Sequence, residues 1–188
     1  MAANALTMAG TLTNSADVMN SLVNEGAARW YAAYTSANHE KRVAEQLGIR
    51  EVEYFLPLYA SVRQWKDRRV ELKLPLFPGY VFVRIALLES LRVLQVPGVA
   101  RLVGFGGVPT ALPEEEMAAL RTGLECGVRA QPHPFLRRGR HARIKAGPLA
   151  GLQGILVRRK NRARFILSVE LIQRSVVVEV DEADLEPA

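Results

Sequence analysis

The sequence is poor in the residues from which metal centres and redox sites are built. Its 188 residues include one cysteine, Cys126, and three histidines. A single cysteine excludes a disulfide within the chain and a metal cluster held by cysteines alone. The histidines, His39, His133 and His141, are far apart, and no His-Glu-x-x-His pattern accompanies them. We therefore expect neither zinc nor any other cofactor.

Long apolar runs and an early basic segment are also missing. No stretch approaches the roughly 18 apolar residues that a membrane helix requires. The first basic residue is Arg29, so the N-terminal region lacks the charged start of a signal peptide and the arginine-rich face of a transit peptide. We expect a cytoplasmic protein with no membrane partner.

No set of catalytic residues assembles either. Cys126 has no activating partner near it in the sequence, and a lone cysteine is more often an inert apolar residue. The glycine-rich segment 104–107 lacks the third glycine and the following helix of a dinucleotide-binding loop. We therefore do not expect an enzyme.

What the sequence does contain is enough apolar residues for a folded protein and an uneven positive charge. Hydrophobic residues make up 49% of the chain and charged residues 23%, a balance that excludes a disordered chain. Of the net charge of +6, residues 135–188 supply +5, with 11 bases and 6 acids. Five of these bases are Arg158, Arg159, Lys160, Arg162 and Arg164. Such a cluster indicates an anionic partner, nucleic acid first, or else only a solvated hairpin tip.

Hydrophobic periodicity divides the chain into a tail, two folded units and a linker. Residues 1–27 show no sustained period, which predicts a mobile tail. Residues 28–127 alternate predicted strands and helices, typical of an α+β domain with helices packed on an antiparallel sheet. Residues 128–134 contain two prolines and are expected to be a linker. Residues 135–188 show five short strand patterns, which predict a small SH3-like β-barrel.

The same patterns set approximate bounds for the elements. In the first unit they predict strands at 30–34, 51–57, 80–85 and 101–105, helices at 37–47, at 87–94 and from Pro113, and a hairpin with a charged tip over 61–76. In the second unit they predict strands at 140–145, 154–159, 164–170, 175–180 and 184–186.

The first distinctive motif is Pro-Leu-Phe-Pro-Gly-Tyr-Val-Phe-Val at 75–83. The Pro-Gly bend leads into a strand in which Tyr80 and Phe82 occupy alternate positions, so the two rings share one face of the sheet. Phe77 can lie beside them. These aromatic side chains either fill the core or form a partly exposed patch that receives another protein's helices.

The second motif covers residues 139–157, Gly-Arg-His-Ala-Arg-Ile-Lys-Ala-Gly-Pro-Leu-Ala-Gly-Leu-Gln-Gly-Ile-Leu-Val. A strand, a Gly-Pro turn and the spaced Gly151 and Gly154 lead into a second strand. This pattern is typical of the KOW module, a small barrel found in transcription and ribosomal proteins.

Together with Trp30-Tyr31 and the His-Glu-Lys-Arg segment at 39–42, these motifs make residues 29–187 resemble the NusG family of transcription elongation factors. The resemblance implies a NusG N-terminal-like domain at 28–127 and a KOW barrel at 135–188. The stretch 154–187, which includes segments 157–161 and 171–175, is most similar to specialised paralogues, which are antiterminators associated with polysaccharide biosynthesis operons.

The resemblance implies that the first domain binds the clamp helices of RNA polymerase and bridges the main cleft, so that the protein suppresses pausing or termination. An aromatic pocket suits this task, because Phe and Tyr bury large areas at interfaces. The matching residues are Tyr34, Phe77, Tyr80 and Phe82 in the pocket, and Glu89, Ser90 and Arg92 in a short helix that touches the opposite side of the cleft.

The resemblance also implies contacts with the non-template DNA strand through His39, Lys41 and Arg42. A histidine can stack on an unpaired base, and Lys or Arg can hold phosphates. The alternative is a solvated helix face with a structural histidine.

The barrel of a general family member recruits a ribosomal protein or the termination factor Rho through exposed aromatic side chains. The matching residues here are Leu149, Leu152 and Ile172, which are apolar but not aromatic and could also be core. This departure argues against Rho binding. The arginine-rich segment 158–164 could instead contact nascent RNA or the ribosome.

The alternative to a polymerase-binding factor is an RNA- or ribosome-binding KOW protein that does not bind polymerase. In either case we expect a monomer. Some specialised relatives refold the barrel into helices, but the Val-rich segments 155–157 and 176–180 favour strands. We therefore predict no such switch.

Overall fold

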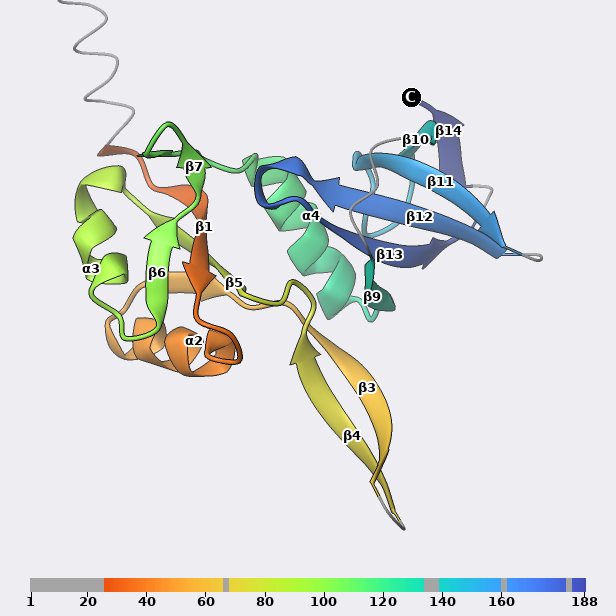
Figure 1. The fold of residues 1–188 in the computed structure, drawn as a ribbon. Coiled ribbons are helices and arrows are strands. Elements are labelled where there is room, and N and C mark those ends of the chain that lie inside the picture. The colour runs from red at the N-terminus through yellow and green to blue at the C-terminus, as the bar shows by residue number, and fades with distance from the viewer. Residues whose placement is uncertain (1–25, 66–67, 134–138, 160–161, 182–183) are drawn as a thin grey trace, which may run out of the picture.

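A computed structural model describes residues 26–65, 68–133, 139–159, 162–181 and 184–188. The predicted mobile tail falls on residues 1–27, of which 1–25 lie outside the described residues. Figure 1 shows a mixed unit of sheet and helices, a unit made of strands, and helix α4 between them.

The first unit is built on a four-stranded antiparallel sheet with the strand order β2-β5-β1-β6. Strand β1 lies inside this sheet, and Tyr34 of β1 is directly opposite Tyr80 of β5. The four strands are β1 (Arg29–Thr35), β2 (Glu53–Phe55), β5 (Tyr80–Ile85) and β6 (Val99–Leu102).

Helices cover both faces of this sheet, because β1 and β5 carry apolar residues at successive positions. On one face Tyr31 and Val83 pack with Val43 of α2 and Val93 of α3. On the other face Trp30, Ala32 and Phe82 pack with Met117 and Leu120 of α4. The helical elements are α2 (Glu40–Ile49), the 3-10 turn η1 (Leu87–Glu89), α3 (Ser90–Leu94) and α4 (Glu114–Glu125).

Two hairpins extend from the first unit. Strands β3 (Leu58–Trp65) and β4 (Arg68–Pro75) form a long two-stranded ribbon that projects from the body of the molecule (Figure 1). Strands β7 (Gly104–Phe105) and β8 (Val108–Pro109) form a short second hairpin.

The second unit is a six-stranded antiparallel sheet with the order β14-β10-β11-β12-β13-β9, here called the C-terminal sheet. The five strands predicted in this part of the chain all form. Its elements are β9 (Ala130–His133), β10 (Arg140–Ile144), β11 (Gln153–Arg159), β12 (Arg162–Val169), the 3-10 turn η2 (Glu170–Ile172), β13 (Arg174–Val180) and β14 (Leu185–Pro187).

The structure differs from the sequence prediction at several places. The strand predicted at 51–57 is limited to β2, and the hairpin predicted over 61–76 begins earlier, at Leu58. Residues 130–133 of the expected linker form β9, which pairs with β13; this is an edge strand, where a proline such as Pro132 is tolerated. Helix α2 begins at Glu40 rather than 37, because Asn38 adopts a left-handed φ of 62° that a helix cannot include. The strand predicted at 101–105 is divided between β6 and β7.

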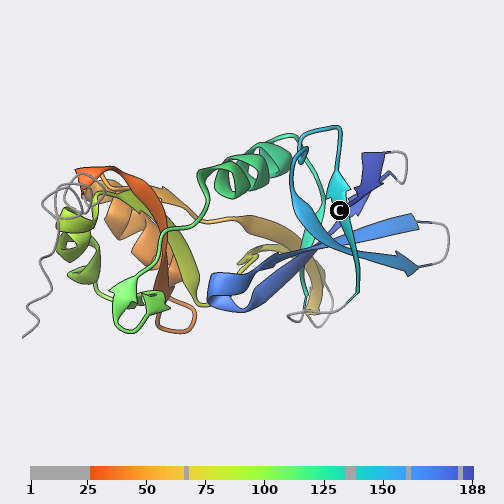
Figure 2. The same ribbon diagram turned by 90° about the horizontal axis from the view of Figure 1, so that it is seen from above.

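The two units share one apolar core. A single cluster of buried side chains runs from Phe77 and Phe82 through Leu120 of α4 to Phe165 and Val176 of the C-terminal sheet. Figure 2 shows α4 reaching from the first unit to this sheet. The face of the first sheet that carries Phe82 is therefore covered.

Candidate functional site

The Pro-Gly bend before β5 brings four aromatic rings together, here called the aromatic face: Tyr34, Phe77, Tyr80 and Phe82. The ring centroids of Tyr34 and Tyr80 are 5.4 Å apart, and Phe77 meets Phe82 edge-on at 5.4 Å. Gly79, in the bend, has a φ of +86°, which favours glycine. The prediction that Phe77 lies beside the rings of β5 is confirmed.

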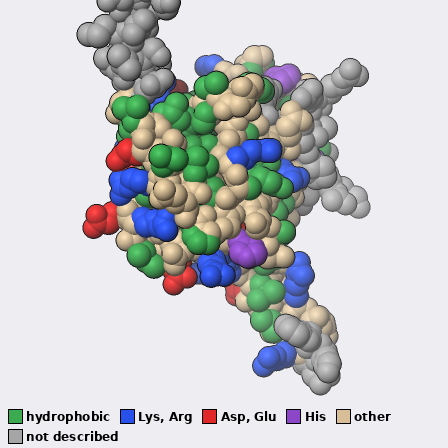
Figure 3. All heavy atoms as spheres, turned by 60° about the vertical axis from the view of Figure 1, so that its left-hand side comes forward, with side chains coloured by type: hydrophobic (Ala, Val, Ile, Leu, Met, Phe, Trp, Pro, Cys, Tyr) green, Lys and Arg blue, Asp and Glu red, His purple; other side chains and the backbone are tan. Residues whose placement is uncertain are grey.

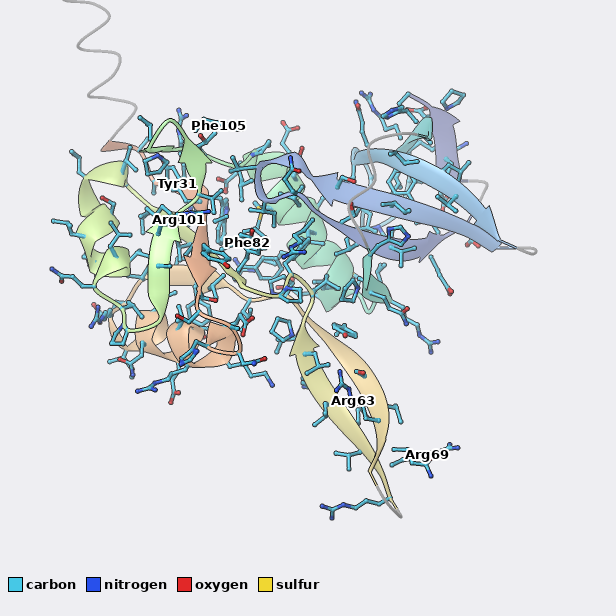
Figure 4. All side chains as sticks on the ribbon, in the orientation of Figure 1. Tyr31, Arg63, Arg69, Phe82, Arg101 and Phe105 are labelled. Carbon is cyan, nitrogen blue, oxygen red and sulfur yellow. The ribbon has the colours of Figure 1, made fainter. Side chains whose placement is uncertain are left out.

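The four rings differ in exposure. Phe77 and Phe82 are fully buried, Tyr80 is half-buried, and Tyr34 is 37% exposed. The phenylalanines thus fill a core, and the two tyrosines lie at its margin. In Figure 4, Phe82 lies between the first sheet and the second unit.

The C-terminal sheet closes over the aromatic face. The guanidinium of Arg174, the first residue of β13, lies 5.9 Å from the centroid of Tyr80. The boundary also contains a cavity of about 550 Å³, lined by Phe77, Leu120, Leu152 and Val176 among others. This pocket is partly open to solvent, since its lining also includes the exposed residues Glu115 and Glu116.

The three residues expected to form the barrel's partner surface are buried: Leu149, Leu152 and Ile172. Leu149 lies against α4 so closely that a Cβ atom at Gly123 would overlap its Cδ2. In this arrangement these side chains are core residues, and they present no surface to a partner.

Glu40 is a site residue that the sequence did not reveal. Although charged, it is buried, and its Oε1 accepts a 2.7 Å hydrogen bond from the backbone N–H of Gly79. It therefore fixes the bend that presents Phe77 and Tyr80. An acidic residue in the first turn of a helix is ordinarily explained by the helix dipole. No signal in the sequence indicated a partner 39 residues away.

We expect the Glu40→Ala variant to unfold more easily than the parent, by about 1–3 kcal/mol, because the Gly79 N–H would be buried without an acceptor. Urea denaturation followed by circular dichroism measures this. Glu40→Gln keeps a side-chain oxygen and should lose less. Equal stability of Glu40→Ala and the parent would contradict the role assigned to the hydrogen bond.

The second predicted polymerase contact lies at η1 and α3, on the opposite face of the sheet from the aromatic face. Arg92 forms an ion pair with Glu89 at 3.0 Å, and its Nη2 donates to the Arg50 carbonyl at 2.7 Å. Arg92 therefore joins α3 to the end of α2, and Ser90 is half-buried. The side chains that project are Leu88 and Leu91, which are 68% and 64% exposed and were not predicted.

The predicted DNA contacts, His39, Lys41 and Arg42, are all exposed at the start of α2. The Nδ1 atom of His39 lies 3.0 Å from the Ala37 carbonyl and must donate to it, which leaves Nε2 as the acceptor of the neutral ring. Arg101, which the sequence did not single out, lies 5.2 Å from the centre of the Tyr34 ring (Figure 4).

The predicted basic cluster is centred on the β11–β12 hairpin. The backbone register pairs Arg159 with Arg162, and Val157 with Arg164. Arg158 is opposite Ala163 in the same ladder. Lys160 lies outside the described residues.

The described part of the chain offers little for chemistry. It contains no group of three or more His, Cys, Asp or Glu side chains that could hold a metal ion, and Cys126 is exposed. None of the helices in this part is long and apolar enough to cross a membrane.

The described residues thus form a mixed unit with an aromatic face and a second unit of strands that covers it. Comparison with known proteins assigns the family. The family model described as "Transcription termination factor nusG" matches residues 28–121. The chain belongs to the NusG family of transcription factors.

Relatives match along most of the chain. The transcription termination/antitermination protein NusG of Deinococcus radiodurans is 30% identical over 182 residues, covering 81% of this chain and 95% of that protein. The protein of the same name from Campylobacter jejuni is 29% identical over 165 residues, covering 81% and 93%. A solved structure described as "Domain interaction in Thermotoga maritima NusG" has a TM-score of 0.54 at 21% identity, over 87% of this chain and 98% of that one. This likeness supports the fold.

Proposed function

We propose that this protein is a transcription elongation and antitermination factor that binds RNA polymerase through the aromatic face. The observation that carries the proposal is the cluster of four rings on one sheet face within the segment that matches the family. Aromatic clusters of this kind anchor protein interfaces because they bury large apolar areas.

The η1–α3 segment supplies a second contact in this proposal. It lies across the sheet from the aromatic face, so one rigid domain can touch two sides of a cleft at once. Exposed Leu88 and Leu91 offer apolar area, while Glu89 and Arg92 hold the segment in place. Closing a cleft in this way would hold polymerase in its elongating form.

The proposal includes a closed state, in which the C-terminal sheet competes with polymerase for the aromatic face. Phe77 and Phe82 are buried under α4 and this sheet, so a partner can reach them only after the sheet moves. The units that separate would be a NusG N-terminal-like domain at 28–127 and a KOW-type barrel at 135–188, with β9 accompanying the barrel.

Nucleic acid contacts complete the proposed mechanism. His39, Lys41 and Arg42 form an exposed set that suits the non-template strand, with the ring for stacking and the two cations for phosphates. The 158–164 hairpin would contact nascent RNA or the ribosome. Because Leu149, Leu152 and Ile172 are buried, we do not assign a Rho contact to them.

We further propose that the protein is a specialised paralogue rather than a general factor, and that it acts as a monomer. The support is the resemblance of segments 157–161 and 171–175 to antiterminators of polysaccharide biosynthesis operons. Its genomic neighbourhood tests this: the gene should precede a long biosynthetic operon rather than lie beside genes for translation.

Transcription in vitro through a terminator tests the proposed activity. We expect read-through to rise several-fold when the protein is added, both with and without Rho. Unchanged or increased termination would contradict the antitermination proposal. A protein that bound RNA but not polymerase would instead support the alternative, an RNA- or ribosome-binding KOW protein.

A further inference from the structure

The β3–β4 hairpin is a structural feature that the proposed function does not use. Its two strands pair only with each other, in register from Leu58 opposite Pro75 to Trp65 opposite Arg68. Eight residues per strand give a ribbon on the order of 26 Å long, at about 3.3 Å per residue. The ribbon projects from the body of the molecule (Figures 1 and 4). A projecting ribbon of this length can reach a partner that the body does not touch.

The hairpin carries the whole positive excess of the first unit. Residues 58–75 contain five bases and two acids, whereas the rest of 28–127 contains eight bases and nine acids. The space-filling view agrees: Lys and Arg side chains line the hairpin, and charges of both signs mix on the body (Figure 3). Within the first unit, which is otherwise nearly neutral, this positive arm is the part that attracts a polyanion.

The described bases of the hairpin are available for contacts with a partner. None of its described bases forms an ion pair with a described residue, and all four are exposed. Three arginines of the body, Arg84, Arg92 and Arg121, each pair with a glutamate. The four described bases of the hairpin are Arg63, Arg68, Arg69 and Lys73.

The register distributes these bases over both faces of the ribbon. Arg69 is opposite Gln64 and Lys73 is opposite Ala60, and both pairs lie on one face. Arg63 lies on the other face, as does Arg68 opposite Trp65. Figure 4 shows Arg63 about halfway along the ribbon and Arg69 near its tip. Cations on both faces suit a site with phosphates on two sides.

We propose that the β3–β4 hairpin binds double-stranded DNA by lying in its major groove. That groove is about 12 Å wide and admits a two-stranded ribbon, with a phosphate backbone on each side. The major groove of duplex RNA is too deep and narrow for side chains to read. The contacts are to phosphates, so the binding is independent of sequence.

Fluorescence anisotropy with a labelled 30-base-pair duplex and the full chain tests this proposal without polymerase. We expect the Arg63→Ala/Arg69→Ala variant to bind about tenfold more weakly at low salt, and the slope of log K against log salt to fall by about two. Arg63→Lys/Arg69→Lys should restore most of the affinity, because lysine also binds phosphate as a point charge.

The matched control removes two bases from the other unit. Arg143→Ala/Lys145→Ala makes the same charge change at exposed positions of β10 and the turn that follows it. If the control weakened binding as much as the hairpin variant, the effect would be one of net charge and the proposal would be wrong. Equal losses for a single strand and a duplex would also overturn it. Unchanged binding by the hairpin variant would mean that the charges only keep the ribbon edges from aggregating.

Because this assay contains no polymerase, its failure leaves the proposed function intact. Failure of polymerase binding would likewise leave the hairpin proposal standing. Movement of the amide NMR signals of 58–65 and 68–75 on adding duplex, with those of 40–49 unmoved, would locate the contact on the ribbon.

Discussion

RNA polymerase should bind the Tyr34→Ala/Tyr80→Ala variant on the order of a hundredfold more weakly than the parent, a loss of about 2–4 kcal/mol typical of aromatic anchors. These two rings are in contact at the margin of the aromatic face, where Tyr34 is 37% exposed. They can be removed without emptying the core. Co-purification and titration with purified polymerase measure the loss.

The choice of tyrosines follows from burial. Phe77→Ala would also be informative, but truncating a fully buried phenylalanine costs about 3–5 kcal/mol of folding stability, which could itself abolish binding. Tyr54 provides a matched control, because it is 38% exposed and lies against Gly48 of α2, on the other face of the sheet. If Tyr54→Ala weakened binding as much as the double variant, or if the double variant bound normally, the aromatic face would not be the docking surface.

Gly123→Leu should have the opposite effect and tighten polymerase binding, because it destabilises the closed state. Each 1.4 kcal/mol of destabilisation should raise the affinity about tenfold. Any side chain at Gly123 meets Leu149, which holds the C-terminal sheet against α4. Helix α4 itself should tolerate the change, since leucine favours a helix more than glycine does. Polymerase affinity and hydrogen exchange of the aromatic face measure the opening.

Ala118→Leu is the control for Gly123→Leu, because it adds the same bulk at an exposed position of α4. Leu149→Glu is a second route to the open state, since it would place a carboxylate in an apolar boundary. If both Gly123→Leu and Leu149→Glu exposed the aromatic face without raising polymerase affinity, competition by the C-terminal sheet would not limit binding.

Strands and helices of this protein were predictable where local pattern and tertiary structure agree. Strand β5 begins at Tyr80 and ends at Ile85 as predicted, because a Pro-Gly bend and a regular apolar run define it. Helix α4 begins directly after Pro113, which suits a helix start. The start of α2 was misplaced, because the backbone of Asn38 decides it. Strand β9 was taken for linker, since its proline disfavours a strand everywhere except at an edge.

Some features of the candidate site were likewise predictable from local sequence, and others depend on the tertiary structure. The placement of Tyr80 and Phe82 on one face of the sheet followed from strand alternation, which is a local property. The bend before β5 then brings Phe77 against Phe82. The hydrogen bond from Gly79 to Glu40 did not follow from local sequence, because it joins segments that only folding brings together. The exposure of Leu88 and Leu91 likewise depends on which side of α3 the sheet covers.

The amino-acid sequence by itself determined the α+β first unit and the all-β second unit, because these depend on hydrophobic periodicity, and its motifs carried the resemblance to the NusG family. Only the tertiary structure decided which aromatic rings are accessible, since burial depends on the C-terminal sheet packing against a distant face. It also decided that the described bases of the β3–β4 hairpin have no ion-pair partners among the described residues, whereas Arg84, Arg92 and Arg121 of the body are paired. Paired and unpaired bases differ in which residues the fold brings close to them, and local sequence does not encode that proximity.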